Sequence, residues 1–186
     1  MSLRPGRSER TAALFPAWHG RPLTLSRALY GTFPAFRTAF DDVCAVLEGT
    51  LALPLAVVVF APEDGVDARL LARAEYGQSA LFAYEVSLYR LWQDRGVRVA
   101  AVAGDGVGAI AAAHVAGGLP LRVAAARSTA PLEHAPPQAA AHLLAAGHTT
   151  LLECGPATHH PATVGDTQTL LSTLPHSAPA PLPTRA

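Results

Sequence analysis

The chain has 186 residues, and half of them are apolar, which suits one compact domain with a hydrophobic core and leaves no room for two large ones. Fourteen basic and fourteen acidic side chains cancel, which excludes a basic field that would attract nucleic acid or an anionic membrane. No apolar run approaches the roughly 18 residues of a membrane span. The two cysteines, Cys44 and Cys154, form neither a disulfide framework nor a zinc site, so we expect a reducing, cytoplasmic environment.

The first half of the chain predicts one strand followed by helices. Residues 11–16 are a short apolar stretch that ends in proline, as expected for a buried strand. Residues 27–47 carry apolar side chains three or four positions apart, which predicts an amphipathic helix that Pro34 divides into two. The clearest helix is expected at 78–95. The positions that alternate between its apolar and polar faces are Leu81, Phe82, Glu85, Leu88, Tyr89 and Trp92.

The second half predicts strands that alternate with helices. The expected elements are a fully buried strand at 97–103, a glycine turn at 104–108, helices at 109–116, 121–127 and 138–146, and a strand at 149–153. This order favours an α/β fold, in which helices flank both faces of a parallel sheet. We place this domain at residues 11–175, between a flexible arm at 1–10 and a disordered, proline-rich tail at 176–186.

The glycine turn, GDGVGA at residues 104–109, has three interpretations. It satisfies the dinucleotide fingerprint GxGxxA, but the acidic residue expected about 20 positions later is missing around residues 121–127. We therefore predict no nucleotide cofactor. It is also similar to a strand–nucleophile–helix elbow, GxSxG, in which Gly106 occupies the serine position. The third interpretation is a turn whose glycines serve only tight bending and close packing.

Three segments resemble the acyltransferase domains of modular polyketide synthases, which are relatives of malonyl-CoA:acyl carrier protein transacylase. Residues 74–118 contain QSALF and GDGVGAIAAA, where the family reads QPALF and GHSxGExAAA. Residues 29–44 and 142–156 are similar to the family's first helices and to its closing FLExGP segment. These motifs keep the family's order and cover most of residues 11–175. The resemblance implies the large, α/β-hydrolase-like subdomain of an acyltransferase.

The family transfers a malonyl-type group from coenzyme A to a carrier protein through a serine ester. A distant histidine is the base, while backbone N–H groups and an early glutamine stabilise the oxyanion. In this chain Gly106 stands at the serine position, Asp105 at the neighbouring histidine and Ala109 at the elbow glutamate. The resemblance therefore implies that the nucleophile is missing.

The early loop, which reads GQG in the family, is Ala17-Trp18-His19 here. An indole thus replaces the glutamine of the oxyanion loop. By the same resemblance, Trp18 and His19 would line a remnant pocket together with Gly104 and Val107.

A deletion accompanies these changes. Residues 128–138 stand where the family has a small ferredoxin-like subdomain, the arginine that pairs with the substrate carboxylate and the catalytic histidine. We expect its loss to uncover a groove above the elbow, to be covered by a partner protein or a second copy of the chain. A synthase module or an acyl carrier protein is the expected partner, and a polyketide-type molecule the expected ligand.

Two candidate sites remain. Asp105 at the mouth of the former site could act as an acid or base, or it could cap the start of a helix. His159 and His160 lie close to Cys154 in sequence, but they lack the spacing of a helical metal-binding pair and no carboxylate cluster joins them. We predict no metal.

Two functions, with a relic as a third possibility, follow from this sequence. The first is a catalytically degenerate acyltransferase-like protein of a polyketide pathway that binds a synthase module, a carrier protein or an acyl intermediate. The alternative is a repurposed cyclase, hydrolase or dehydratase that uses Asp105. A relic without function is disfavoured, because amphipathic patterning survives in every predicted helix.

Overall fold

The computed structural model describes residues 11–20, 23, 25–62, 64–132 and 135–156. The predicted arm at 1–10, the predicted tail at 176–186 and the histidine pair at 159–160 lie outside the described residues.

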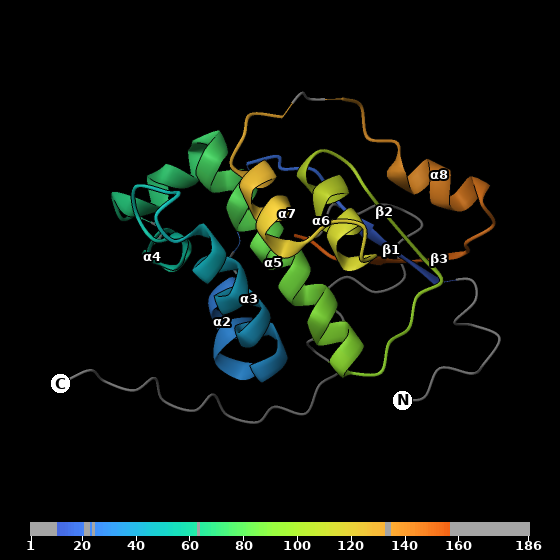
Figure 1. Cartoon of the computed structure of the whole chain (residues 1–186). Helices are drawn as coiled ribbons and strands as arrows, with labels where there is room; N and C mark the ends of the chain where they lie inside the picture. The colour runs from blue at the N-terminus through green and yellow to red at the C-terminus, as the bar shows by residue number, and fades with distance from the viewer. Residues whose placement is uncertain (1–10, 21–22, 24, 63, 133–134, 157–186) are drawn as a thin grey trace.

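A three-stranded parallel sheet is the framework of the fold (Figure 1). Strand β1 (Thr11–Phe15) lies in the centre, between β2 (Ala101–Gly104) and β3 (Thr150–Glu153). Ala12 is paired with Ala101 on one side and with Leu151 on the other. The described residues contain this single sheet with parallel pairs throughout, which confirms the α/β prediction.

The strand expected at 97–103 is shorter than predicted and is not fully buried. Strand β2 begins only at Ala101 and each of its residues is half-buried. Strand β2 lies at an edge of the sheet, but this position alone does not account for its exposure, because three of the four residues of the other edge strand, β3, are buried.

Helices cover both faces of the sheet, as the sequence predicts. The side chains of β1 alternate between the faces, because successive residues of a strand point in opposite directions. Ala12 and Leu14 pack with Leu143 of α8 (Ala139–Ala145) in a small cluster. Ala13 and Phe15 belong to the main core on the opposite face.

Helix α5 (Ala74–Asp94) runs through the main core. It begins one turn before the predicted start at residue 78 and gives way to Gly96, which has φ +79°. Almost all of its side chains are buried, so the predicted polar face is wrong: Glu85 is fully buried. The physical reason is that neighbouring helices pack against α5 from several sides, which leaves no solvent-facing side in its middle.

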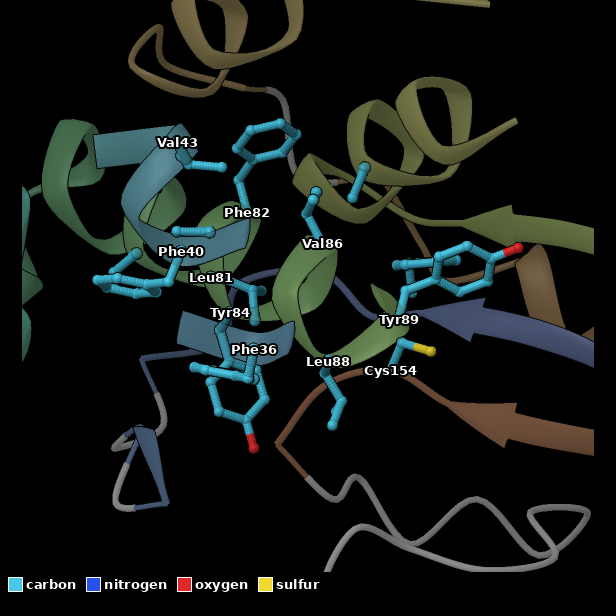
Figure 2. Close-up of a cluster of buried hydrophobic side chains, with 14 of the residues drawn as sticks. Phe36, Phe40, Val43, Leu81, Phe82, Tyr84, Val86, Leu88, Tyr89 and Cys154 are labelled. Atoms are coloured by element: carbon cyan, nitrogen blue, oxygen red, sulfur yellow. The ribbon is translucent and has the colours of Figure 1, made fainter. Parts of the chain in front are cut away.

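Helices α2 (Ser26–Thr32) and α3 (Pro34–Leu47) are separated at Pro34, as predicted. Helix α3 packs its buried aromatic rings against α5, with the ring centroids of Phe36 and Tyr84 5.8 Å apart in an edge-on arrangement (Figure 2). The remaining elements are α4 (Leu55–Val59), the 3-10 helix η1 (Asp67–Ala72), α6 (Val107–Val115) and α7 (Leu121–Ser128). None of the helices within the described ranges is both long and apolar enough to cross a membrane.

Candidate functional site

The glycine turn forms a sharp elbow between β2 and α6, at the carboxyl end of the sheet. Gly106 precedes the first residue of α6 and has φ +55° and ψ −125°. A residue with a side chain is strained at such a positive φ. A Cβ added to Gly106 would also lie 3.1 Å from the Cβ of Ala17. The elbow therefore has the strained geometry in which a nucleophile is presented, but glycine presents no side chain.

Two further glycines let α6 approach the sheet closely. A Cβ on Gly108 would overlap the carbonyl group of Phe15, and one on Gly104 would overlap the backbone of Gly108. The amide of Asp105 donates a hydrogen bond to the carbonyl of Phe15 at 3.0 Å. The elbow is thus fixed to the end of β1 by backbone contacts, which only glycine permits at these positions.

The first turn of α6 begins with hydrogen bonds from Gly108 to Asp105 (2.9 Å) and from Ala109 to Gly106 (3.1 Å). The amides of Gly106 and Val107 come before these bonds, so α6 itself offers them no acceptor. Such amides favour an anion or a polarised carbonyl oxygen. The side chain of Val107 is buried in the core, so only its backbone can face a ligand.

The Asp105 side chain holds the start of α8 by hydrogen bonds. Its carboxylate accepts hydrogen bonds from the amides of Gln138 (2.8 Å) and Ala139 (3.1 and 3.2 Å), at the start of α8. A carboxylate at this place satisfies N–H groups that the helix cannot pair. The helix that Asp105 caps is therefore α8, which follows it by more than 30 residues, and not the helix that the turn opens.

The early loop sends its three side chains in different directions. Ala17 faces the elbow. Trp18 is half-buried and lies against Gly77, where an added Cβ would come within 2.5 Å of the indole Nε1. His19 is exposed. Of the sequence-predicted pocket residues, the structure brings Gly104, Gly106 and Val107 to the elbow through their backbones, while the indole packs against α5.

Sequence reasoning missed two features near this site. One is Gly77, which leaves room for Trp18; a glycine inside a strong helix pattern was the available signal. The other is Glu85, which is fully buried and whose two carboxylate oxygens have no hydrogen-bond partner among the described residues. The apolar residues on both sides of Glu85 in the sequence were the signal that it belongs to the core.

Burial raises the pKa values of two acidic groups near this site, Glu85 and Cys154. The pKa of Glu85 is raised well above its ordinary 4.5, first by burial and then by the charge of Glu153. Burial and the same two carboxyl groups raise the pKa of the Cys154 thiol, so it is no reactive thiolate. Within the described ranges, no group of three or more histidine, cysteine, aspartate or glutamate side chains could hold a metal ion.

Comparison with known proteins identifies the family. The model of the acyl transferase domain matches residues 23–176. The chain is 44% identical over 117 residues to the polyketide synthase GfsA of Streptomyces halstedii, which corresponds to 63% of this chain and 2% of that protein. It is 42% identical over 111 residues to a "putative inactive phenolphthiocerol synthesis polyketide synthase type I Pks1" of Mycobacterium tuberculosis, or 60% of this chain and 7% of that protein.

Solved structures agree. A loading acyltransferase of the avermectin modular polyketide synthase is 32% identical, with a TM-score of 0.58, over 64% of this chain and 36% of that one. The acyltransferase domain from the second module of the salinomycin polyketide synthase is 38% identical, with a TM-score of 0.56, over 65% of this chain and 27% of that one. The chain thus spans a small part of its curated relatives and about a third of these solved chains. By sequence and by fold, it belongs to the acyl transferase domain family of polyketide synthases.

Proposed function

We propose that this chain is a catalytically degenerate acyltransferase-like protein of a polyketide pathway, which binds a synthase module, a carrier protein or an acyl intermediate and does not transfer acyl groups. One observation carries the proposal: the residue at the tip of the elbow is Gly106, with φ +55° and no side chain.

Acyl transfer through an ester needs a hydroxyl or thiol at the elbow and a base within hydrogen-bond reach of it. Within the described residues, Ala17 lies against Gly106, and Asp105 precedes it in the turn. The first has no functional group, and the second accepts hydrogen bonds from the start of α8 through both carboxylate oxygens. Neither one replaces the serine.

The same observation weighs against the alternative in which Asp105 is the acid or base of a cyclase, hydrolase or dehydratase. A base must present a free lone pair to its substrate. Asp105 instead joins the elbow to α8. We therefore assign it a structural role in this proposal.

Binding of an acyl group, unlike its transfer, needs hydrogen-bond donors but no nucleophile, and the elbow retains such donors. The amides of Gly106 and Val107 precede the bonded turn of α6 and suit the carbonyl oxygen of a thioester or a carboxylate. Without a nucleophile, such a bound acyl group would not react.

Calorimetric titration tests the binding role. The protein is titrated with malonyl-CoA and with acyl carrier protein, unloaded or malonyl-loaded, and release of free coenzyme A is followed in parallel. We expect binding of the carrier protein, tighter when it is loaded, and no release. Steady release of coenzyme A, or no binding of any of these three probes, contradicts the proposal.

Two glycine variants locate the acyl site. Gly106→Ala adds a methyl group at the elbow, whereas Gly147→Ala adds one at an exposed glycine with φ +90° and nothing within 4 Å. Both substitutions place an alanine at a positive φ, +55° at Gly106 and +90° at Gly147. We expect Gly106→Ala to weaken binding of the malonyl group several-fold more than Gly147→Ala. Equal effects would place the acyl group elsewhere.

A further inference from the structure

Two buried carboxyl groups lie where β1 and β3 end. Glu85 comes from the middle of α5, and Glu153 is the last residue of β3. Their residues are 0% and 2% exposed. Both oxygens of Glu85 lack a hydrogen-bond partner among the described residues. We call Glu85 and Glu153 the carboxyl pair.

The carboxyl pair lies at the ends of β1 and β3: Glu153 is the last residue of β3, and Glu85 lies against Gly155. A Cβ added to Gly155 would lie 3.7 Å from Oε1 of Glu85 and would overlap the ring of Pro16. The amide of Cys154 donates a hydrogen bond to the carbonyl of Leu14 at 2.8 Å, which extends the β1–β3 ladder by one rung. We define the β1–β3 junction as residues 14–16 and 153–155.

Among the described residues, the titratable groups near Glu85 include two from other parts of the chain and one from its own helix. On its own helix, Tyr89 lies one turn away; from the other side come Glu153 and Cys154, and Figure 2 shows Tyr89 and the Cys154 thiol side by side. Burial disfavours the ionised form of Glu85, and among the described residues the charge of Glu153 acts in the same direction. Burial and Cys154 raise the pKa of Tyr89, while Arg90 acts in the opposite direction.

We propose that the carboxyl pair is a proton-operated lock on the β1–β3 junction, closed while Glu85 carries its proton and opened locally when that proton leaves to solvent. Opening hydrates the new carboxylate, which a closed junction cannot do. The junction continues directly into Ala17, which faces Gly106, and Phe15 accepts the hydrogen bond from Asp105. The lock therefore governs the loop that borders the elbow, whatever the elbow binds.

The sign of the pH dependence follows from linkage. Below pH 4.5, the ordinary pKa of the group, Glu85 is protonated in both the closed and the open form, so the lock is at full strength. As the pH rises, the open form ionises while the closed form stays protonated. The opening equilibrium then increases about tenfold per pH unit until the raised pKa of the closed form is reached.

Hydrogen exchange of the Cys154 amide reports this opening. Protection factors are measured between pH 5 and pH 8, corrected for the intrinsic pH dependence of exchange, and compared with the Phe40 amide inside α3. We expect protection at Cys154 to fall about tenfold per pH unit over the lower part of this range, while Phe40 changes far less. A pH-independent Cys154 amide, or an equal fall at Phe40, overturns the proposal.

Two variants of matched chemistry separate the carboxyl pair from other carboxylates. Glu85→Gln keeps the shape and removes the titration, so the slope at Cys154 should disappear. Glu48→Gln makes the same change at an exposed residue after α3 and should retain the slope of the unmodified protein. A slope that persists in Glu85→Gln overturns the assignment. If Glu85→Gln does not fold, the contrast between Cys154 and Phe40 in the unmodified chain decides the matter alone.

Discussion

The helical core is filled by large, interlocking side chains, whereas the glycine elbow has no side chain at its tip. In the core, α3 and α5 interlock large aromatic side chains, and Phe36, Phe40 and Tyr84 are almost completely buried. At the elbow, the backbone geometry that presents a nucleophile persists, while its tip is glycine and its neighbouring carboxylate is bound to α8. The difference shows that the core depends on the packing of large side chains, whereas the shape of the elbow depends on backbone contacts and needs no side chain at its tip.

The largest effect is expected from Phe36→Ala. Phe36 is fully buried between Phe40 and Tyr84, so its removal leaves a cavity and should lower the free energy of unfolding by about 3–5 kcal/mol. The matched control is Val57→Ala, at a residue that is 47% exposed, where the change should stay within about 0.5 kcal/mol. Urea unfolding measures both. Similar changes in the free energy of unfolding for the two variants would show that Phe36 contributes no more to stability than an exposed side chain does.

A smaller effect is expected where the early loop meets α5. Gly77→Ala forces a methyl group toward the indole of Trp18 and should cost about 1–3 kcal/mol. Gly31→Ala, in α2 with nothing within 4 Å, should be neutral or stabilising. The methyl group added at residue 77 would also lie 2.6 Å from the backbone carbonyl oxygen of Leu71, so Trp18→Ala should restore only part of the stability that Gly77→Ala removes. Additive effects of the two substitutions would show that the indole does not lie against residue 77.

The contact between the elbow and α8 is expected to contribute less. Asp105→Ala removes the acceptor for Gln138 and Ala139, and the loss of such a cap amounts to about 1 kcal/mol. Amide exchange should accelerate in α8 and remain unchanged in α3. Unaltered exchange throughout α8 would mean that Asp105 does not hold this helix. Asp42→Ala, at an exposed residue of α3, is the control for loss of a carboxylate.

The smallest effect is the difference between two glycine variants. Gly106→Ala and Gly147→Ala both place an alanine at positive φ, which costs about 1–2 kcal/mol in each case. Only the first meets another side chain, the Cβ of Ala17 at 3.1 Å. Thermal unfolding should therefore show Gly106→Ala to be slightly the less stable of the two. The reverse order would indicate that Ala17 does not border the elbow.

Local patterns in the sequence predicted much of the fold. Pro34 separates two helices, and the apolar segments at 11–16 and 149–153 contain β1 and β3, because each depends on a few neighbouring residues. The turn predicted at 104–108 is present but shorter, since Gly104 ends β2 and α6 begins at Val107. The exposure of β2 could not be predicted in this way, since it depends on which distant parts of the chain cover a strand, and the two edge strands β2 and β3 differ in burial.

The candidate site was only partly accessible from the sequence. The missing side chain at Gly106 can be read directly, since the motif fixes its place at the elbow. That Asp105 caps α8 cannot, because the partners are more than 30 residues apart and meet only through the fold. The same holds for Glu85, whose burial results from helices that pack around α5.

Intact mass spectrometry after incubation with malonyl-CoA tests the central claim most directly. An active acyltransferase domain of a polyketide synthase, treated in parallel, should gain one malonyl group. This protein should keep its unmodified mass, and Gly106→Ser should too, because Asp105, the carboxylate that the described residues place next to the elbow, is hydrogen-bonded to the start of α8. A stable malonyl adduct on the unmodified protein would contradict the account, since it would reveal a nucleophile that glycine cannot supply.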